Sequence, residues 1–284
     1  MKFKIFSDLH LEFYNTSDVR KIKRTLDNHF PAEENDKETI LLLAGDIGTY
    51  KQWDLTYKIV FEIFSKQFKQ VFAIPGNHSW YKSDIWGREN EFLKDKKLPK
   101  NVIYGDDFSY QIDKDTIIIG CCLWTDMNKE NPLFMNYAQG AMNDYVYIKK
   151  PYETNDMSVY QTYHKKTIIA QDTFDRHIKS KQFIIDKLNY ACEQGIKNKI
   201  ILSHHAPSFQ SVDNQFRGDA LNPAYCSDLE SIMVDYNVTL WCHGHQHTSN
   251  DYMIENTRVI INSFGYHGYE VNPKFNPNLI IELN

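Results

Sequence analysis

The sequence lacks the features of membrane proteins, disulfide-rich proteins and zinc fingers. No window of its 284 residues approaches the roughly 18 consecutive apolar residues that a membrane-spanning helix needs. Its five cysteines are odd in number and form no Cys-x-x-Cys pair, so we expect reduced thiols rather than disulfides or a structural zinc site. The N-terminal segment MKFKIFSDLHLEF becomes charged too soon for a signal peptide. These absences predict a cytoplasmic protein without a membrane partner.

An excess of basic residues is also absent. The chain has 32 Lys and Arg against 37 Asp and Glu, and its formal net charge is −5. Proteins that bind duplex nucleic acid usually carry a basic stripe, so this balance disfavours duplex nucleic acid as a partner. The sequence has no internal repeat, low-complexity tract or linker-like stretch. We therefore expect one domain over residues 1–284, while the oligomeric state is not indicated.

The first eighty residues contain short apolar runs that alternate with helix-compatible segments. Strands are predicted over residues 2–6, 39–48 and 70–78, and residues 17–37 are charged and helix-compatible. An amphipathic helix is predicted over residues 53–68. This alternation is typical of an α/β fold with parallel central strands.

The middle of the chain departs from this pattern. Residues 101–124 are typical of short antiparallel strands. Residues 125–165 show no sustained period and are too long for a plain connection, so we predict an inserted cap or lid. A long helix should follow, and its apolar face is predicted to contain Phe174, Ile178, Ile185, Leu188 and Cys192.

The α/β pattern then returns. Strands are predicted over residues 199–208, 238–247 and 257–265, and in the closing NLIIEL segment. Ser227 and Glu230 have the spacing of a capping box and are predicted to open a helix.

Polar side chains follow five of the predicted strands, and seven of the eleven histidines lie among them. In chain order these residues are Asp8 and His10, Asp46, Asn77 and His78, His204 and His205, and finally His243, His245 and His247. In open α/β sheets, ligands bind at the carboxyl ends of the strands. The five blocks together therefore predict a metal site at this edge. We expect His243 to point to the face opposite His245 and to serve a structural role.

The residue types suit a pair of divalent cations. Two such ions roughly 3.5–4 Å apart need about seven or eight protein ligands and a shared anion. Asp46 has two carboxylate oxygens and is placed to be that shared ligand. Nitrogen and oxygen ligands without thiolate suit manganese, iron, zinc or nickel.

The series DLH, GDIG, GNH, SHHAP and GHQH resembles the calcineurin-like metallophosphoesterase superfamily over nearly the whole chain. The resemblance implies a four-layer αββα sandwich of two mixed β-sheets flanked by helices. It also implies that Asp8, His10 and His247 hold one metal ion. Asn77, His204 and His245 would hold the other ion, and Asp46 would bridge the two.

The resemblance further implies a phosphohydrolase in which a metal-bridging hydroxide attacks phosphorus. His78 matches the family's histidine that is not a ligand and that supports or protonates the leaving oxygen. Either His204 or His205 could be the ligand in SHHAP; analogy with the family favours His204 and makes His205 a substrate or supporting contact.

Outside the five blocks, the candidates for substrate contacts are weaker. Arg217 could clamp a phosphate oxygen or be a solvated loop residue. Trp124 and the aromatic residues of the predicted cap could line the substrate cleft or simply pack together. We expect His29, His164, His177 and His267 to be surface or loop residues.

The leading hypothesis is a metal-dependent phosphoesterase acting on a phosphomonoester or phosphodiester. One alternative is a nuclease or cyclic-nucleotide phosphodiesterase of the same superfamily, with a small nucleotide as substrate. Another is a scaffold that kept the fold and lost turnover, which should show broken ligand blocks, whereas all five blocks are intact here.

Overall fold

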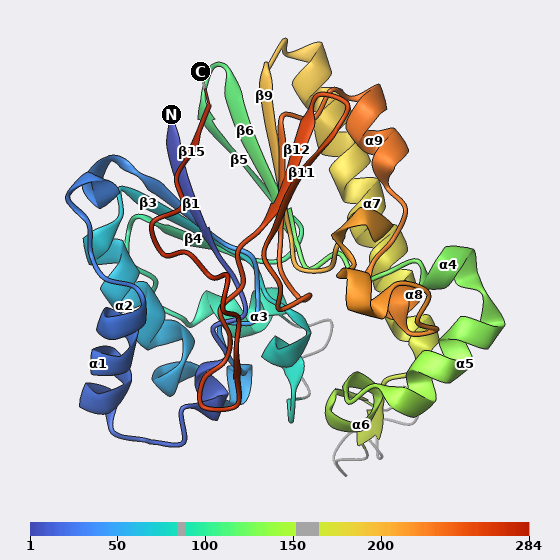
Figure 1. Cartoon of the computed structure of the whole chain (residues 1–284), viewed down its shortest axis with the longest axis horizontal. Coiled ribbons are helices and arrows are strands. Elements are labelled where there is room, and N and C mark those ends of the chain that lie inside the picture. The colour runs from blue at the N-terminus through green and yellow to red at the C-terminus, as the bar shows by residue number, and fades with distance from the viewer. Residues whose placement is uncertain (84–88, 152–164, 284) are drawn as a thin grey trace.

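Two mixed β-sheets pack face to face between two layers of helices (Figure 1). The computed structural model describes residues 1–83, 89–151 and 165–283. The first sheet has the strand order β15 (Ile281–Glu282), β1 (Lys2–Phe6), β2 (Ile40–Leu43), β3 (Gln70–Ala73) and β4 (Val102–Tyr104). The second has the order β11 (Asn250–Ile254), β12 (Thr257–Ile261), β10 (Leu240–His243), β9 (Asn198–Ser203), β6 (Thr116–Cys121) and β5 (Phe108–Asp113). The predicted fold class, a sandwich of two mixed sheets flanked by helices, is confirmed.

The parallel strands of the first sheet are buried on both faces, which explains their continuous apolar sequences. Ile5, Leu42 and Phe72 are cross-strand neighbours, and they pack against residues of the second sheet such as Ile200 and Leu240. The next residue of each strand points to the other face and packs under the helices. Each strand thus joins two hydrophobic layers.

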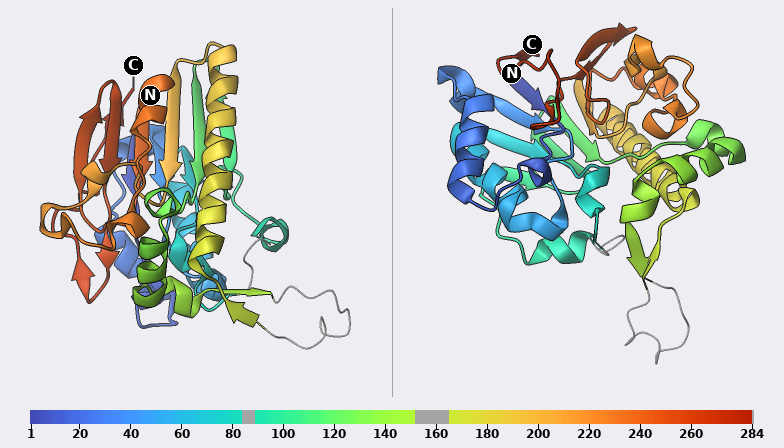
Figure 2. Two further views of the ribbon diagram at one scale, coloured as in Figure 1. Left: turned by 90° about the vertical axis from the view of Figure 1, so that its right-hand side faces the viewer. Right: turned by 60° about the horizontal axis from the view of Figure 1, so that its bottom comes forward.

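Helices cover the outer face of each sheet. α1 (Val19–His29) and α2 (Tyr57–Gln67) lie on the first sheet, and α7 (Ala170–Glu193) and α9 (Glu230–Asp235) lie on the second (Figures 1 and 2). The amphipathic helix predicted from Trp53 begins at Tyr57, because Trp53 belongs to a separate turn of 3₁₀-helix, η3 (Tyr50–Leu55).

The buried face of α7 differs from the prediction. Ile178 and Cys192 are exposed, whereas Thr173 and His177 are fully buried. The expectation that His177 is a surface residue is therefore wrong. Its Nδ1 donates a hydrogen bond to the carbonyl oxygen of Leu123 at 3.1 Å. The buried face of this helix thus includes a polar contact with the loop after β6, and the spacing of apolar residues in the sequence does not reveal such a contact.

The predicted capping box at Ser227 is also wrong. α9 begins at Glu230 with Leu229 in the N-cap position and without a side-chain cap. The hydroxyl of Ser227 accepts a hydrogen bond from the backbone N–H of Asp126, and Glu230 accepts one from Ser208. Both side chains are used by other segments, so neither caps the helix.

The predicted insertion at 125–165 contains regular structure. It comprises α4 (Met127–Glu130), α5 (Pro132–Ala141), α6 (Asp144–Tyr147) and β7 (Lys149–Pro151), while residues 152–164 lie outside the described part of the chain. β7 pairs in antiparallel fashion with β8 (Lys165–Thr167), and this hairpin projects from the body of the molecule (Figure 2). In α4 the φ angles of all four residues are positive, so this element is a left-handed turn.

The remaining elements are short and lie mostly around the edges of the sheets. They are η1 (Leu11–Phe13), η2 (Glu34–Glu38), η4 (Asn77–Trp80), α3 (Glu89–Lys94), η6 (Phe209–Ser211), η7 (Asn214–Phe216), α8 (Asn222–Tyr225), β13 (Gly265–Tyr266) and β14 (Glu270–Val271). Among the described residues, no helix combines the length and the apolar character needed to cross a membrane.

One ion pair is buried beneath the helices of the first sheet. The Nζ of Lys4 lies 2.6 Å from the carboxylate of Asp36, and both residues are 1% exposed. The same carboxylate accepts hydrogen bonds from the Gln67 side chain at 2.7 Å and from the backbone of Glu33 at 2.9 Å. Asp36 therefore joins β1, α2 and the loop before β2.

Candidate metal centre

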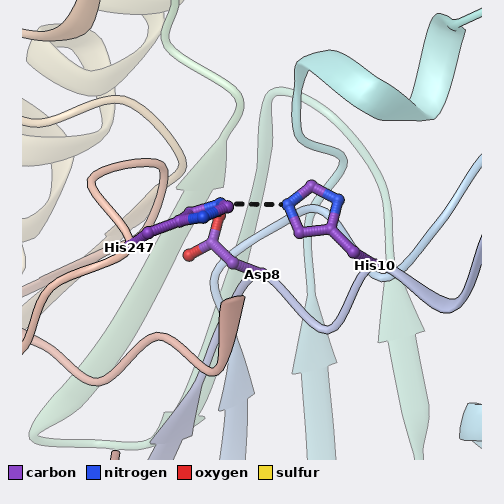
Figure 3. Close-up of side chains that lie close together, drawn as sticks. All are labelled: Asp8, His10 and His247. Atoms are coloured by element: carbon purple, nitrogen blue, oxygen red, sulfur yellow. Dashed lines mark hydrogen bonds and ion pairs between the residues drawn. The ribbon is translucent and has the colours of Figure 1, made fainter. Parts of the chain in front are cut away.

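The five strand-end blocks meet at one edge of the sandwich. Asp8 follows β1 and Asp46 follows β2, while His204 follows β9 and His247 lies in the loop after β10. Figure 3 shows Asp8 and His10, from one loop, and His247, from a segment distant in the sequence, pointing toward one another. Because β1 and β2 run parallel in the first sheet and β9 and β10 run parallel in the second, the carboxyl ends of these strands bring the residues together.

The backbone at this edge is strained. Asp8, His10, Asp46, His245 and His247 all have φ angles between 46° and 70°, the left-handed region that non-glycine residues seldom adopt. Residues held in such conformations cluster at functional sites, where the surrounding structure maintains them.

Two glycines allow the close approach that the site requires. A Cβ atom at Gly76 would lie 2.1 Å from an oxygen of Asp46, and one at Gly45 would lie 2.4 Å from the ring of His204. Any side chain at either position would therefore displace a candidate ligand.

One group of candidate ligands comprises Asp8, His10 and His247, whose ligand atoms lie within 4.8 Å of one another. The Nε2 atoms of His10 and His247 are 3.1 Å apart (Figure 3). The Nε2 of His247 is 3.6 Å from Asp8 Oδ1. Two imidazole nitrogens and a carboxylate oxygen thus face a common point.

A second group comprises Asp46, His204 and His245. The Nε2 of His204 lies 3.3 Å from Asp46 Oδ2 and 2.9 Å from Asn77 Oδ1. The same Asp46 oxygen is 3.6 Å from His10 Nε2, so it lies between the two groups. The sequence-predicted ligands are all brought together here, with Asp46 in the shared position.

These residues fit a pair of cations on two observations. The Nε2 of His245 is buried without a hydrogen-bond partner among the described residues, as expected of an atom reserved for a metal ion. His204 donates through Nδ1 to the Ala44 carbonyl at 2.9 Å, so its Nε2 faces the oxygens of Asn77 and Asp46. Burial lowers the pKa of His204, but Asp46 outweighs this effect and raises it, so positive charge is favoured at this position.

Supporting hydrogen bonds orient the candidate ligands. Asn77 donates through Nδ2 to Asp144 at 2.9 Å, which turns its amide oxygen toward His204. Asp144 is fully buried and belongs to α6, so the predicted insertion contributes directly to this site. Such partners fix the orientation of metal ligands.

His78 lies beside the two groups and shares a carboxylate with His10. Its Nδ1 is 2.9 Å from Glu12 Oε1, and the Nδ1 of His10 is 3.0 Å from the same oxygen. Burial would raise the pKa of Glu12, but the two histidines lower it to about 2, so the ionised carboxylate accepts from both rings. Burial lowers the pKa of His78, yet Asp46 and Glu12 outweigh it and raise that pKa to about 9.

His78 also has the proximity of a possible ligand. With His10 and Asp46 it forms a third group of atoms within 4.8 Å. Its backbone N–H donates to Asp46 Oδ1 at 2.9 Å. The ring of His78 stacks on Tyr81 with 4.0 Å between centroids.

The other candidates from the sequence belong to none of the three groups of candidate ligands found among the described residues. His205 is buried, its ring stacks on Trp124 at 5.0 Å, and its Nδ1 donates to the Cys122 carbonyl at 3.2 Å. Burial lowers the pKa of His205 well below its usual value, so the ring is neutral. Trp124 is itself only 3% exposed. Arg217 is exposed and lines a separate cavity.

His243 points away from the candidate ligands. Its Nδ1 donates to the carbonyl of Gly244 at 3.0 Å, and its Nε2 accepts from the hydroxyl of Ser211 at 2.8 Å. Burial lowers the pKa of His243 to about 4, which keeps the ring neutral.

Comparison with known proteins agrees with this geometry. A family model described as calcineurin-like phosphoesterase matches residues 1–249, a range that includes all five strand-end blocks. The chain belongs to this family. The phosphoesterase is accordingly a hydrolase of phosphoesters, and the resemblance recognised from the five motifs is confirmed.

Two relatives extend the comparison. An uncharacterized protein, L509, of Acanthamoeba polyphaga mimivirus is 29% identical over 291 residues, covering 98% of this chain and 95% of that protein. The phosphopantetheinyl hydrolase PptH of Mycobacterium tuberculosis is 14% identical with a TM-score of 0.64, covering 93% of this chain and 89% of that chain. At this level of identity the second likeness shows the fold alone.

Three residues at the candidate site were not predicted from the sequence. Glu12 lies two positions after His10 in SDLHLE, and its acidic side chain beside the first block was the signal that could have revealed it. Asp144 and Tyr266 have no comparable signal. The ring centroid of Tyr266 lies 4.4 Å from that of His10 and 4.4 Å from that of His247.

Proposed function

We propose that the chain is a phosphohydrolase that uses two divalent cations to cleave small phosphomonoesters or phosphodiesters. The observation that carries this proposal is the position of Asp46 Oδ2, at 3.6 Å from His10 and 3.3 Å from His204. One carboxylate thus faces both groups of candidate ligands. Two mononuclear sites would not need this shared position, whereas a dinuclear centre does.

Asp8, His10 and His247 would hold one cation, and Asn77, His204 and His245 the other. When bound, the cations would supply charge stabilisation for the phosphoryl oxygens and lower the pKa of a water molecule. The remaining contributions come from the protein. The strained loops hold the ligands in place, and Glu12 and Asp144 orient the side chains that they contact.

His78 would donate a proton to the leaving oxygen. Because Glu12 accepts from Nδ1, the other ring nitrogen, Nε2, would be the atom that faces a substrate. A pKa raised to about 9 keeps the ring protonated at neutral pH, as a general acid requires.

Removal of divalent cations should abolish hydrolysis of p-nitrophenyl phosphate and bis-p-nitrophenyl phosphate, and added Mn²⁺ should restore it. Without the cations, the nitrogen and oxygen atoms of the candidate ligands would face one another with no divalent positive charge to stabilise the phosphoryl group. Turnover is measured during metal titration together with metal content, for which we expect about two ions per chain. Continued inactivity with manganese, iron, zinc and nickel on both esters would contradict the proposal.

Replacing Glu12 with alanine should lower turnover by about 10–100-fold, because His10 and His78 lose their common acceptor. Glu12→Gln should lose less activity than Glu12→Ala, since an amide oxygen can accept the same two hydrogen bonds while the charge of Asp46 still raises the pKa of His78. The kcat of both variants and their metal content are measured. An equal loss in the two variants would show that the negative charge of Glu12, rather than its positioning of the rings, is what matters.

A further inference from the structure

A polar cavity of about 360 Å³ lies next to the candidate metal centre. One wall is formed by Thr248, Ser249 and Asn250, which directly follow the candidate ligand His247 in the chain. The other side includes Asn214 and Arg217 from the segment between β9 and α9. The cavity and the centre therefore share the loop that follows β10.

Two cationic residues line this cavity without an acidic partner. Neither Arg217 nor Lys274 forms an ion pair with any residue that the structure describes, and both are exposed. One carboxylate also lines the cavity, that of Asp213, and it already accepts a hydrogen bond from the backbone of Gln215 at 3.0 Å. An arginine and a lysine among the residues that line one polar cavity suit a phosphate group, to which arginine can donate two parallel hydrogen bonds.

A hydrogen bond connects the lining of the cavity to β10, the strand that precedes the loop with His245 and His247. Ser211 lines it, and the hydroxyl of Ser211 hydrogen-bonds to His243 Nε2 at 2.8 Å and to the Tyr252 hydroxyl at 2.7 Å. His243 ends β10, and the loop with His245 and His247 begins one residue later. These bonds hold the cavity at a fixed separation from the candidate ligands, which a substrate with two anchoring points requires.

We propose that this cavity binds a second phosphate group of the substrate while the metal centre holds the ester that is cleaved. The natural substrate is then a small phosphoester that carries another phosphate at a defined distance. This inference rests on the proposed function, because it assigns the neighbouring centre to the reacting ester. It gives Arg217 and Lys274 a role in substrate selection rather than in the chemical step.

Alkane-1,n-diphosphonic acids of increasing length test the inference, each compared with the alkylphosphonate of equal chain length. Both are assayed as inhibitors of bis-p-nitrophenyl phosphate hydrolysis with Mn²⁺ in excess. At one chain length the diphosphonate should bind about tenfold more tightly than the alkylphosphonate of the same length, because its second phosphonate group occupies the second anion site. In the R217A/K274A double variant this ratio should fall to about twofold or less, the alkylphosphonate serving as the internal reference.

The R20A/K21A double variant is the matched control, since it removes the same charge from exposed positions at the start of α1. This control variant should show the same ratio of diphosphonate affinity to alkylphosphonate affinity as the wild type. Equal inhibition by both compounds at every length, or an equal loss of the ratio in the control, would overturn the inference.

Phosphorus NMR of the metal-free protein separates this inference from the proposed function. The butylphosphonate signal should shift on addition of wild-type protein and should not shift with R217A/K274A. If no metal ion restores turnover but this shift is seen, the proposed function fails and the phosphate site stands. If turnover is restored and the shift is absent, only the second phosphate site is overturned.

Discussion

The His78→Ala variant should turn over phosphoesters about 10²–10⁴-fold more slowly than the wild type while keeping nearly the same metal content. In the proposed mechanism the His78 ring carries the proton that the leaving oxygen needs, and Glu12 accepts a hydrogen bond from its Nδ1 at 2.9 Å. Loss of this proton donor raises the barrier of the chemical step and leaves the proposed ligands in place. The measurements are kcat with both nitrophenyl esters and the metal content of the purified variant.

The pH profile provides a second readout for His78. A general acid must be protonated, so wild-type turnover should fall as pH rises through the pKa of His78, and the variant should lack this alkaline decline. His29→Ala is the control, because His29 lies in the last turn of α1 and belongs to none of the groups of candidate ligands among the described residues. Unchanged turnover in His78→Ala would exclude proton donation, whereas loss of metal would place His78 among the ligands.

Replacing Asp36 with alanine should lower the free energy of unfolding by about 3–5 kcal/mol. The substitution leaves the ammonium group of Lys4 buried at 1% exposure without its carboxylate partner at 2.6 Å. It also removes the acceptor for the Gln67 side chain. Urea unfolding of the metal-free protein measures the change without interference from ion binding.

Two further variants separate buried charge from lost packing. The K4M/D36L double variant should recover most of the stability, because an apolar pair of similar volume removes both buried charges. Glu282→Ala breaks the exposed pair with Lys2, whose atoms are 3.9 Å apart, and should cost less than about 1 kcal/mol. A double variant as unstable as Asp36→Ala would contradict this account of the Lys4–Asp36 pair.

The sequence alone indicated an α/β fold and predicted which residues form the candidate site. Apolar strands such as residues 39–43 must be buried on both faces, which requires a sheet covered on each side. The polar residues that directly follow such strands then meet at the common carboxyl edge. For this reason Asp46, Asn77 and His204 could be assigned to one site from their positions in the chain.

Only the tertiary structure decided which contacts support that site. Glu12 accepts from His78, 66 positions away, and Asp144 accepts from Asn77, 67 positions away. The buried face of α7 includes His177, which donates a hydrogen bond to Leu123, and Ser227 accepts a hydrogen bond from Asp126 instead of capping a helix. The spacing of apolar residues along the chain predicts which side chains are buried. It does not predict which polar groups form hydrogen bonds with one another across the fold.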